Sequence, residues 1–255
     1  MLLTLDLGNT SLFIGVCDDG KVIDTYRTST NIHKSSDEYV IIFKDLLGDY
    51  INKIDGVICS SVVPCLNYTI KEAIKRLFKI DALFVGPGLK TGLPIRIDTP
   101  NELGSDLVCD CVGALNKYGN STIVVDLGTA TKILVIDKNG AFVGGTISSG
   151  LKISIEALAG KTQNLTETSL EMPKNIIGKN TRDCINSGTV IGTKLMIEAI
   201  CKQMEEEIGY PLKRVVTGGY ANVINNFNDF IYDFNLIHHG LYVIYLKNQG
   251  GKEHE

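Results

Sequence analysis

The sequence predicts an α/β protein made of two similar halves. An internal repeat, an alternation of strand-like and helix-like segments, and an ordinary globular composition indicate this class. Residues 3–22, LTLDLGNTSLFIGVCDDGKV, align without a gap with residues 123–142, IVVDLGTATKILVIDKNGAF. Such an internal repeat reveals the organisation of a chain before any single element does.

Each copy of the repeat reads as an apolar strand, an Asp-x-Gly turn and a second strand. Asp6 and Gly8 in the first copy align with Asp126 and Gly128 in the second. Two unrelated hairpins would also read as strand–turn–strand, because Asp and Gly are common in turns. Agreement of the turns at a single offset favours a gene duplication over that alternative.

A hairpin dipeptide closes the second strand of each copy. Asp19-Gly20 and Asn139-Gly140 are strong signals for a tight turn between antiparallel strands. We therefore expect a third short strand after each dipeptide.

The remaining segments alternate between helical and strand-like patterns. Helices are expected over 35–47, 66–78, 99–115, 181–209 and 239–247, and strands over 55–64, 82–86 and 214–219. Strands that alternate with helices indicate parallel pairing after each opening hairpin. A polar stretch at 116–120 separates the copies, so we expect the halves to span residues 1–117 and 118–255.

Composition restricts the function classes. The chain has 255 residues, of which 44% are hydrophobic and 21% charged, and a net charge of −4. This charge gives no electrostatic footprint for nucleic acid, and no apolar run is long enough to predict a membrane span. The N-terminus has no basic segment typical of a signal peptide. A cytoplasmic protein with reduced thiols in its seven cysteines is expected.

The two Asp-x-Gly turns are candidate phosphate sites. Gly8 permits a backbone conformation that a side chain would forbid, and the amides of such a turn can bind phosphate oxygens. An aspartate beside phosphate is favourable when Mg²⁺ or its waters lie between them. Alternatively, Asp6 and Asp126 only cap their own turns.

Other nucleotide and metal motifs are absent or weak. Gly218-Gly219 follows a buried strand and is a further candidate nucleotide contact. The sequence contains neither G-x-x-x-x-G-K-[ST] nor G-x-G-x-x-G, so a nucleotide would bind by a different route. No Cys or His spacing typical of a zinc site is present.

The stretch TPNELGSDLVCD contains a further carboxylate, Asp106. Thr99, Pro100 and Glu102 predict a helix start with a capping box. The apolar residues that follow recur at helical spacing, and Asp106 lies nearly opposite their centre, beyond the first turn. Gly104 inside a helix costs about 1 kcal/mol relative to Ala, which indicates a close contact there. These residues alone leave Asp106 either a solvated surface charge or a ligand-binding carboxylate.

The motifs in order resemble those of the type III pantothenate kinases, in the acetate and sugar kinase, heat-shock 70 and actin superfamily. The resemblance covers nearly the whole chain and is specific through the order and spacing of its motifs. These motifs are DLGNT (6–10), SSVVP (60–64), VGPGLKTGLPIR (85–96), PNELGSD (100–106), DLGTAT (126–131), GGTISSGL (144–151), IGKNT (177–181) and VTGGYA (216–221). The resemblance implies a duplicated ribonuclease H-like (actin-like ATPase) fold, with two similar halves and a cleft between them.

The resemblance also implies an activity, namely the ATP-dependent phosphorylation of pantothenate to 4'-phosphopantothenate in coenzyme A biosynthesis. Asp106 would be the general base that takes the proton of the substrate hydroxyl. Asp6 would hold Mg²⁺, and Asp126 would lie beside a monovalent cation, K⁺ or NH₄⁺. Members of the family are homodimers, so a homodimer is implied as well.

Two sets of residues would contact the substrates by this resemblance. The set implied for ATP is Asp6, Leu7, Gly8, Asn9, Thr10, Ser11, Leu12, Phe13, Gly128, Thr129, Gly218 and Gly219. The set implied for pantothenate is Ile97, Gly104, Ser105, Asp106, Leu107 and Thr181.

The chain departs from the family pattern on the pantothenate side. Leu107 stands where the family has an arginine, whose planar donors suit a carboxylate or carbonyl, and Ile97 stands where a tyrosine is common. The alternatives are therefore a relative that phosphorylates a different small alcohol and a catalytically impaired paralogue with a regulatory role. Candidates to replace the missing arginine are Arg96, Lys132 and Arg182.

Overall fold

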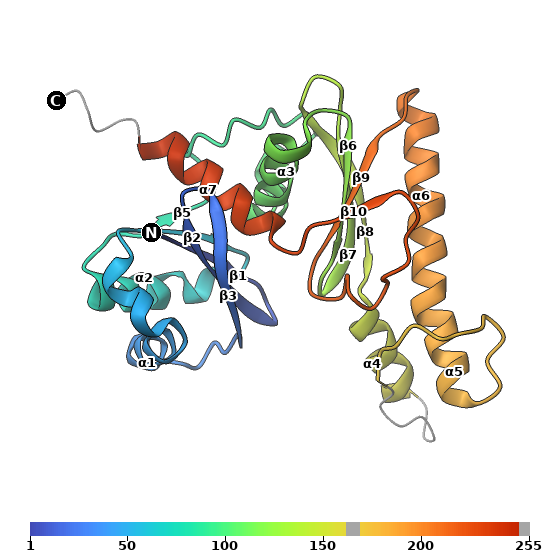
Figure 1. The fold of residues 1–255 in the computed structure, drawn as a ribbon, viewed down its shortest axis with the longest axis horizontal. Helices are drawn as coiled ribbons and strands as arrows, with labels where there is room; N and C mark the ends of the chain where they lie inside the picture. The colour runs from blue at the N-terminus through green and yellow to red at the C-terminus, as the bar shows by residue number, and fades with distance from the viewer. Residues whose placement is uncertain (162–168, 250–255) are drawn as a thin grey trace. The chain divides into compact units, whose positions relative to one another are not determined.

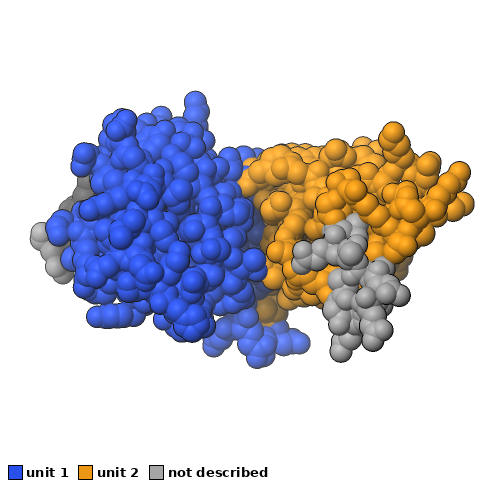
Figure 2. Space-filling model, turned by 90° about the horizontal axis from the view of Figure 1, so that it is seen from below, with its two compact units in different colours: residues 1–93, 98–117, 235–255 blue, residues 94–97, 118–234 orange. Residues whose placement is uncertain are grey.

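The computed structural model describes residues 1–161 and 169–249, and the chain divides into two compact units (Figures 1 and 2). The first unit comprises residues 1–93, 98–117 and the segment from Asn235 onward, and the second comprises 94–97 and 118–234. The units therefore differ from the plain halves 1–117 and 118–255, because the C-terminal helix packs with the first unit. No helix in the described ranges is long and apolar enough to cross a membrane.

The first unit is built on a five-stranded sheet with the order β3-β2-β1-β4-β5. Its strands are β1 (Leu2–Leu7), β2 (Ser11–Asp18), β3 (Lys21–Ser29), β4 (Gly56–Ser61) and β5 (Leu83–Phe84). The first three strands pair antiparallel, whereas β4 runs parallel to β1 and β5 parallel to β4. Its helices are α1 (Ser36–Leu47), α2 (Pro64–Phe78), α3 (Ser105–Tyr118) and α7 (Leu236–Gln249), with short 3-10 turns η1 (Gly48–Lys53) and η2 (Pro100–Glu102).

Helices cover both faces of this first sheet (Figure 1). On one face, Phe43 of α1 and Ile70 of α2 join Leu5 in a fully buried core. The predicted start of α1 is confirmed, because Ser35 caps the helix and forms a capping box with Glu38. On the other face α7 contacts β1, β4, β2 and β3.

Two glycines allow α3 and α7 to approach closely. A side chain at Gly113 of α3 would overlap the backbone carbonyl of Leu236, and one at Gly240 of α7 would overlap that of Cys109. Both positions therefore require glycine, because the backbones of the helices themselves form the contact.

The second unit repeats the sheet with the order β10-β9-β6-β7-β8. Its strands are β6 (Thr122–Leu127), β7 (Ala130–Ile136), β8 (Phe142–Ser149), β9 (Lys213–Thr217) and β10 (Phe230–Tyr232). Its helices are α4 (Leu151–Lys161), α5 (Thr181–Asn186), the π-helical segment η3 (Ser187–Ile191) and α6 (Gly192–Ile208). Read from β8 to β10, the order β8-β7-β6-β9-β10 matches β3-β2-β1-β4-β5 strand for strand. The predicted duplication is thus confirmed.

The gapless alignment of the two copies nevertheless hides two compensating shifts. Leu7 pairs with Leu12, so residues 8–11 form the first turn, whereas Leu127 pairs with Thr131 and the shorter turn contains only 128–130. The next turn compensates, because five residues separate the paired Ile136 and Phe142, whereas four separate the equivalent pair Cys17 and Val22. Asp6 therefore lies opposite Phe13, but Asp126 lies opposite Lys132.

The helix predicted over 99–115 is wrong at its start. Pro100–Glu102 form a separate 3-10 turn, and α3 begins only at Ser105. The Thr99 hydroxyl donates to the Glu102 carboxylate at 3.0 Å instead of capping the backbone. Gly104 thus precedes the helix, and the penalty for glycine inside a helix does not apply.

Candidate functional site

The turn after β1 is held by the third strand. The Gly8 amide donates to the Ser11 carbonyl at 3.1 Å. The Thr30 hydroxyl donates to the Gly8 carbonyl at 2.6 Å, and its amide donates to the Thr10 carbonyl at 3.0 Å. Thr30 was missed from the sequence, because the third strand, which it directly follows, extends to Ser29.

The side chains in and beside this turn differ in their exposure to solvent. Asn9 and Thr10 are exposed, whereas the side chains of Leu7 and Leu12 are fully buried in the core. A ligand at this turn can therefore meet Leu7 and Leu12 only through their backbone.

Arg27 brings positive charge to the same turn. Its guanidinium donates to the Ser11 hydroxyl at 3.0 Å and lies 4.0 Å from the centre of the Phe13 ring. Arg27 lies opposite Phe13 in the register of β2 and β3. An arginine stacked on a ring and aimed at a hydroxyl is well placed to meet an anion.

A serine pair ties α3 to the end of β4. Asp6 of β1 and Ser60 of β4 are partners in the parallel ladder. The Ser60 and Ser105 hydroxyl oxygens lie 3.1 Å apart. The Ser105 hydroxyl also donates to the Ser61 carbonyl and accepts from the Ser61 amide, both at 3.0 Å. These bonds fix the first residue of α3 at the sheet end that carries Asp6.

Asp106 lies in the first turn of α3, and the prediction that it lies beyond the first turn is wrong. A carboxylate in this position interacts favourably with the helix dipole. A side chain at Gly104 would come within 2.5 Å of the Asp106 Oδ1 atom. The close contact expected at Gly104 is therefore with the Asp106 carboxylate itself.

The helix that carries Asp106 is more buried than a helix on the protein surface. All residues from Leu107 to Ala114 are buried, so α3 has no single apolar face. Leu107 has 8% of its surface exposed. Its side chain is a packing group, and a substrate contact there is restricted mainly to its backbone.

Burial and nearby acidic side chains both affect the pKa of Cys109. Burial raises the pKa of the Cys109 thiol well above its usual value, and the negative charges of Asp6, Asp110 and Asp106 raise it further. The thiol is therefore protonated and is no nucleophile.

The turn after β6 is enclosed by glycines. The Gly128 amide donates to the Ala130 carbonyl at 3.1 Å. Gly218 has a φ of +97°, and a side chain on it would come within 2.5 Å of the Asp126 Oδ1 atom. A side chain at Gly150 would overlap the carbonyls of Thr129 and Gly128. The backbone thus surrounds Asp126, while Thr129 and Gly219 remain exposed.

Lys132 already supplies a cation to Asp126. Its ammonium lies 2.8 Å from Asp126 Oδ2, and the two side chains are 17% and 12% exposed. Two unit charges 4 Å apart repel by about 4 kcal/mol at an effective dielectric constant of 20. An exchangeable monovalent cation beside Asp126 therefore does not fit while Lys132 keeps this position.

The first turn does fit a magnesium ion. No group of three or more His, Cys, Asp or Glu side chains within the described ranges could hold a metal by itself. Magnesium, however, is commonly bound through one or two carboxylates together with the phosphates of a substrate. Asp6 offers one such carboxylate, and the other ligands would come from the substrate phosphates and water.

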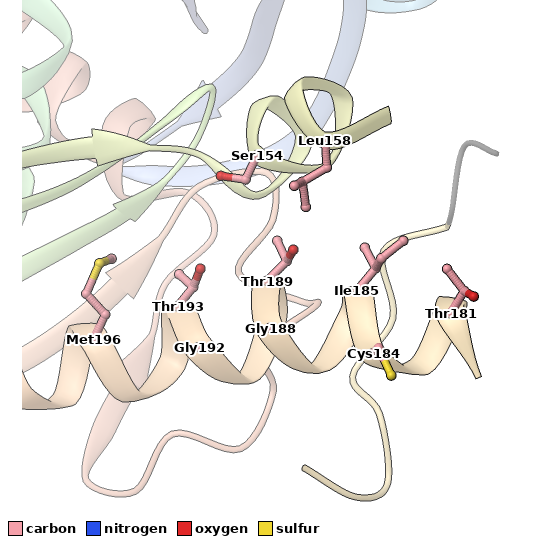
Figure 3. Close-up of a pocket in the computed structure, with 10 residues that line it drawn as sticks. All are labelled: Ser154, Leu158, Thr181, Cys184, Ile185, Gly188, Thr189, Gly192, Thr193 and Met196. Carbon is pink, nitrogen blue, oxygen red and sulfur yellow. The ribbon is translucent and has the colours of Figure 1, made fainter. Parts of the chain in front are cut away.

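The other predicted substrate residues lie in the second unit. Thr181 begins α5 and lines a cavity of about 640 Å³ between α4 and α6 (Figure 3). In Figure 3, Ser154 and Leu158 of α4 face Thr189 across this cavity, whereas the sulfur of Cys184 points away from it. Ile97 is half-buried in the short segment 94–97 of this unit.

The three candidates for the missing arginine all have acidic partners. Arg182 donates to Glu171 at 2.7 Å, and Arg96 lies 3.8 Å from Asp137. Lys132 is paired with Asp126, as described above. Each of these cations would need to leave its carboxylate before it could meet a substrate.

Comparison with solved structures defines the class. An activator of 2-hydroxyisocaproyl-CoA dehydratase from Clostridium difficile, solved with ADPNP, has a TM-score of 0.54 at 13% identity, over 100% of this chain and 98% of that one. A Campylobacter jejuni protein described as a Baf family transcriptional activator has a TM-score of 0.63 at 20% identity, over 97% and 99%. With the repeated strand order, these similarities define an actin-like ATPase fold.

Comparison of sequences defines the family. The family model for type III pantothenate kinases matches residues 2–203. The type III pantothenate kinases of Myxococcus xanthus and Acidobacterium capsulatum are 36% and 38% identical to this chain, over 97% and 99% of it and over 99% and 97% of their own lengths. The chain belongs to the type III pantothenate kinase family, enzymes that phosphorylate pantothenate in coenzyme A biosynthesis.

Proposed function

We propose that this chain transfers the γ-phosphoryl group of ATP to the hydroxymethyl oxygen of pantothenate, with Asp106 as the general base. The serine pair that fixes α3 beside Asp6 is the observation that supports this most directly. Asp106 accepts the hydroxyl proton as that oxygen bonds to phosphorus and the bond to ADP breaks. Positioning and charge neutralisation account for most of the catalysis in such transfers.

The turn 8–11 binds the phosphates of ATP in this proposal. The exposed Asn9 and Thr10 offer donors, and Arg27 adds positive charge beside Ser11. Mg²⁺ held through Asp6 would neutralise the charge of the phosphates. The turn packs on the buried side chains of Leu7 and Leu12 and on the half-buried Phe13.

The second unit supplies the remaining contacts. Gly128, Thr129, Gly218 and Gly219 surround the Asp126 turn and are proposed to meet ATP. The resemblance predicts K⁺ or NH₄⁺ beside Asp126; here the Lys132 ammonium, 2.8 Å from Asp126 Oδ2, is proposed to provide the positive charge instead.

The pantothenate contacts are drawn from three segments. Gly104, Ser105 and Leu107 present backbone beside Asp106, and Ile97 and Thr181 are proposed from the family pattern. Pantothenate is therefore recognised without an arginine at position 107.

A kinase assay tests the proposal. Purified protein with Mg-ATP and potassium should convert pantothenate to 4'-phosphopantothenate, detected by mass spectrometry alongside ADP release. Nucleotide binding without turnover on pantothenate would contradict the proposal.

Buried Leu107 and the paired cations Arg96 and Arg182 favour one alternative, a different small alcohol as substrate. A panel of pantoate-like alcohols separates that alternative from a regulatory paralogue that phosphorylates none of them.

A homodimer is also proposed. Several large apolar side chains in the stretch of sequence from β8 to α6 are exposed, among them Ile147 at 68% and Ile177 at 77%. A contiguous exposed apolar patch marks a partner-binding surface, and we propose that these side chains form such a patch, which a second copy covers. Light scattering should give twice the chain mass, and Ile177→Glu should shift it toward one chain mass.

A further inference from the structure

We propose that the Lys132 ammonium is a built-in cation at the second phosphate-type turn and makes the protein independent of potassium. The proposal rests on the proposed kinase function, in which positive charge beside Asp126 supports nucleotide binding. It assigns to a side chain of this chain the place that the family resemblance gives to an exchangeable ion.

The strand register fixes Lys132 in this place. Lys132 lies directly opposite Asp126 in the β6–β7 ladder, and its ammonium is 2.8 Å from Asp126 Oδ2. Both side chains are mostly buried. A buried carboxylate requires a compensating partner, and here the partner is covalently part of the neighbouring strand.

The other side of Asp126 is closed by backbone. A Cβ on Gly128 would lie 3.4 Å from Asp126 Oδ1, and one on Gly218 would lie still closer. The carboxylate is thus held between glycine backbone and the ammonium. Lys132 carries three N–H donors, so it can offer the charge of an ammonium ion without requiring one from solution.

Salt substitution combined with two variants tests this role. Initial rates with pantothenate, and affinity for a non-hydrolysable ATP analogue by calorimetry, are measured in potassium chloride and in choline chloride at equal ionic strength. Lys132→Thr leaves space for an ion, whereas Lys132→Met fills that space without charge. Lys138→Thr, an exposed site at the next turn, is the matched control.

The wild-type protein and Lys138→Thr should change less than about twofold between the salts. Lys132→Thr should lose at least about tenfold in analogue affinity in choline chloride, because the uncompensated Asp126 carboxylate would repel the anionic phosphates. Potassium should restore Lys132→Thr but not Lys132→Met.

Other results overturn the inference. A wild-type protein that requires potassium contains an exchangeable ion, and a Lys132→Thr variant that is unaffected in both salts shows that Lys132 has no such role. If no alcohol is phosphorylated, the kinase proposal fails, yet analogue binding still decides the role of Lys132. Failure to bind the analogue in any salt overturns both. If Lys132→Thr does not fold, the salt response of the wild-type protein decides.

Discussion

The hydroxyl oxygens of Ser60 and Ser105 lie 3.1 Å apart and join the end of β4 to the first turn of α3. Because Ser60 is also the ladder partner of Asp6, this pair brings two carboxylates from distant parts of the sequence to one end of the first unit. The contacts of Ser105 hold the first turn of α3, which carries the proposed base, Asp106, at the end of β4.

Asp106→Asn should remove turnover while leaving nucleotide affinity nearly intact. The amide keeps the shape of the side chain but cannot accept the hydroxyl proton, and the loss of a general base typically costs about 10²–10⁴-fold in rate. Single-turnover rates and calorimetry with an ATP analogue measure the two effects. Asp98→Asn, exposed in the preceding loop, should behave as wild type. Substantial turnover by Asp106→Asn would assign the base to another group.

Ser105→Ala should lower both stability and the rate of turnover. The substitution leaves the amide and carbonyl of Ser61 without this partner, which costs about 1–3 kcal/mol where such groups are buried. The misplacement of Asp106 should reduce kcat by about tenfold or more, with little change in the KM for ATP. Ser105→Thr retains a hydroxyl and should restore kcat. A normal kcat in a destabilised Ser105→Ala would limit Ser105 to a structural role.

Leu107→Arg should destabilise the protein rather than improve pantothenate binding. Leu107 is 8% exposed, and burying a guanidinium without a partner costs several kcal/mol. Urea unfolding followed by circular dichroism measures the change. Leu107→Met, which conserves volume, should cost less than about 1.5 kcal/mol. A stable Leu107→Arg variant with a lower KM for pantothenate would show that the arginine reaches the substrate after all.

His238 should make the protein less stable as pH falls below about 6.5. Burial, with a smaller effect of the Arg27 charge, lowers the pKa of His238 to about 3, whereas in the unfolded chain it stays near 6.5. Between these values only the unfolded state binds the proton, so stability is lost as pH decreases. The loss should reach about 2 kcal/mol at pH 5.

Urea unfolding at pH 7 and pH 5 measures the contribution of His238. His238→Gln should reduce the difference between the two pH values by this amount, whereas His33→Gln, at an exposed position, should leave it unchanged. Equal pH dependence in wild type and His238→Gln would mean that His238 is protonated in the folded protein. The side chain contacts Thr4, whose hydroxyl lies 2.9 Å from Nδ1, so the comparison is made within each variant between the two pH values.

Local patterns predicted the elements well. The Asp19-Gly20 turn has positive φ at both residues, as the dipeptide indicates, and Ser35 caps α1 at the start of the helix expected over 35–47. The start of α3 was predicted wrongly, because Thr99, Pro100 and Glu102 satisfy a capping pattern that is completed by a separate 3-10 turn. A capping signal identifies a local turn, but only the packing of Ser105 against β4 decides where the long helix begins.

The sequence by itself determined the duplication, the two Asp-x-Gly turns and the family, since all of these are recorded in the order and spacing of residues. The tertiary structure alone decided which residue faces each aspartate. A turn one residue shorter shifts the register, so that Phe13 lies opposite Asp6 but Lys132 lies opposite Asp126. Neighbours across a sheet are set by hydrogen-bond register, and a shift of one residue changes every side-chain partner without disturbing the alignment of the sequence.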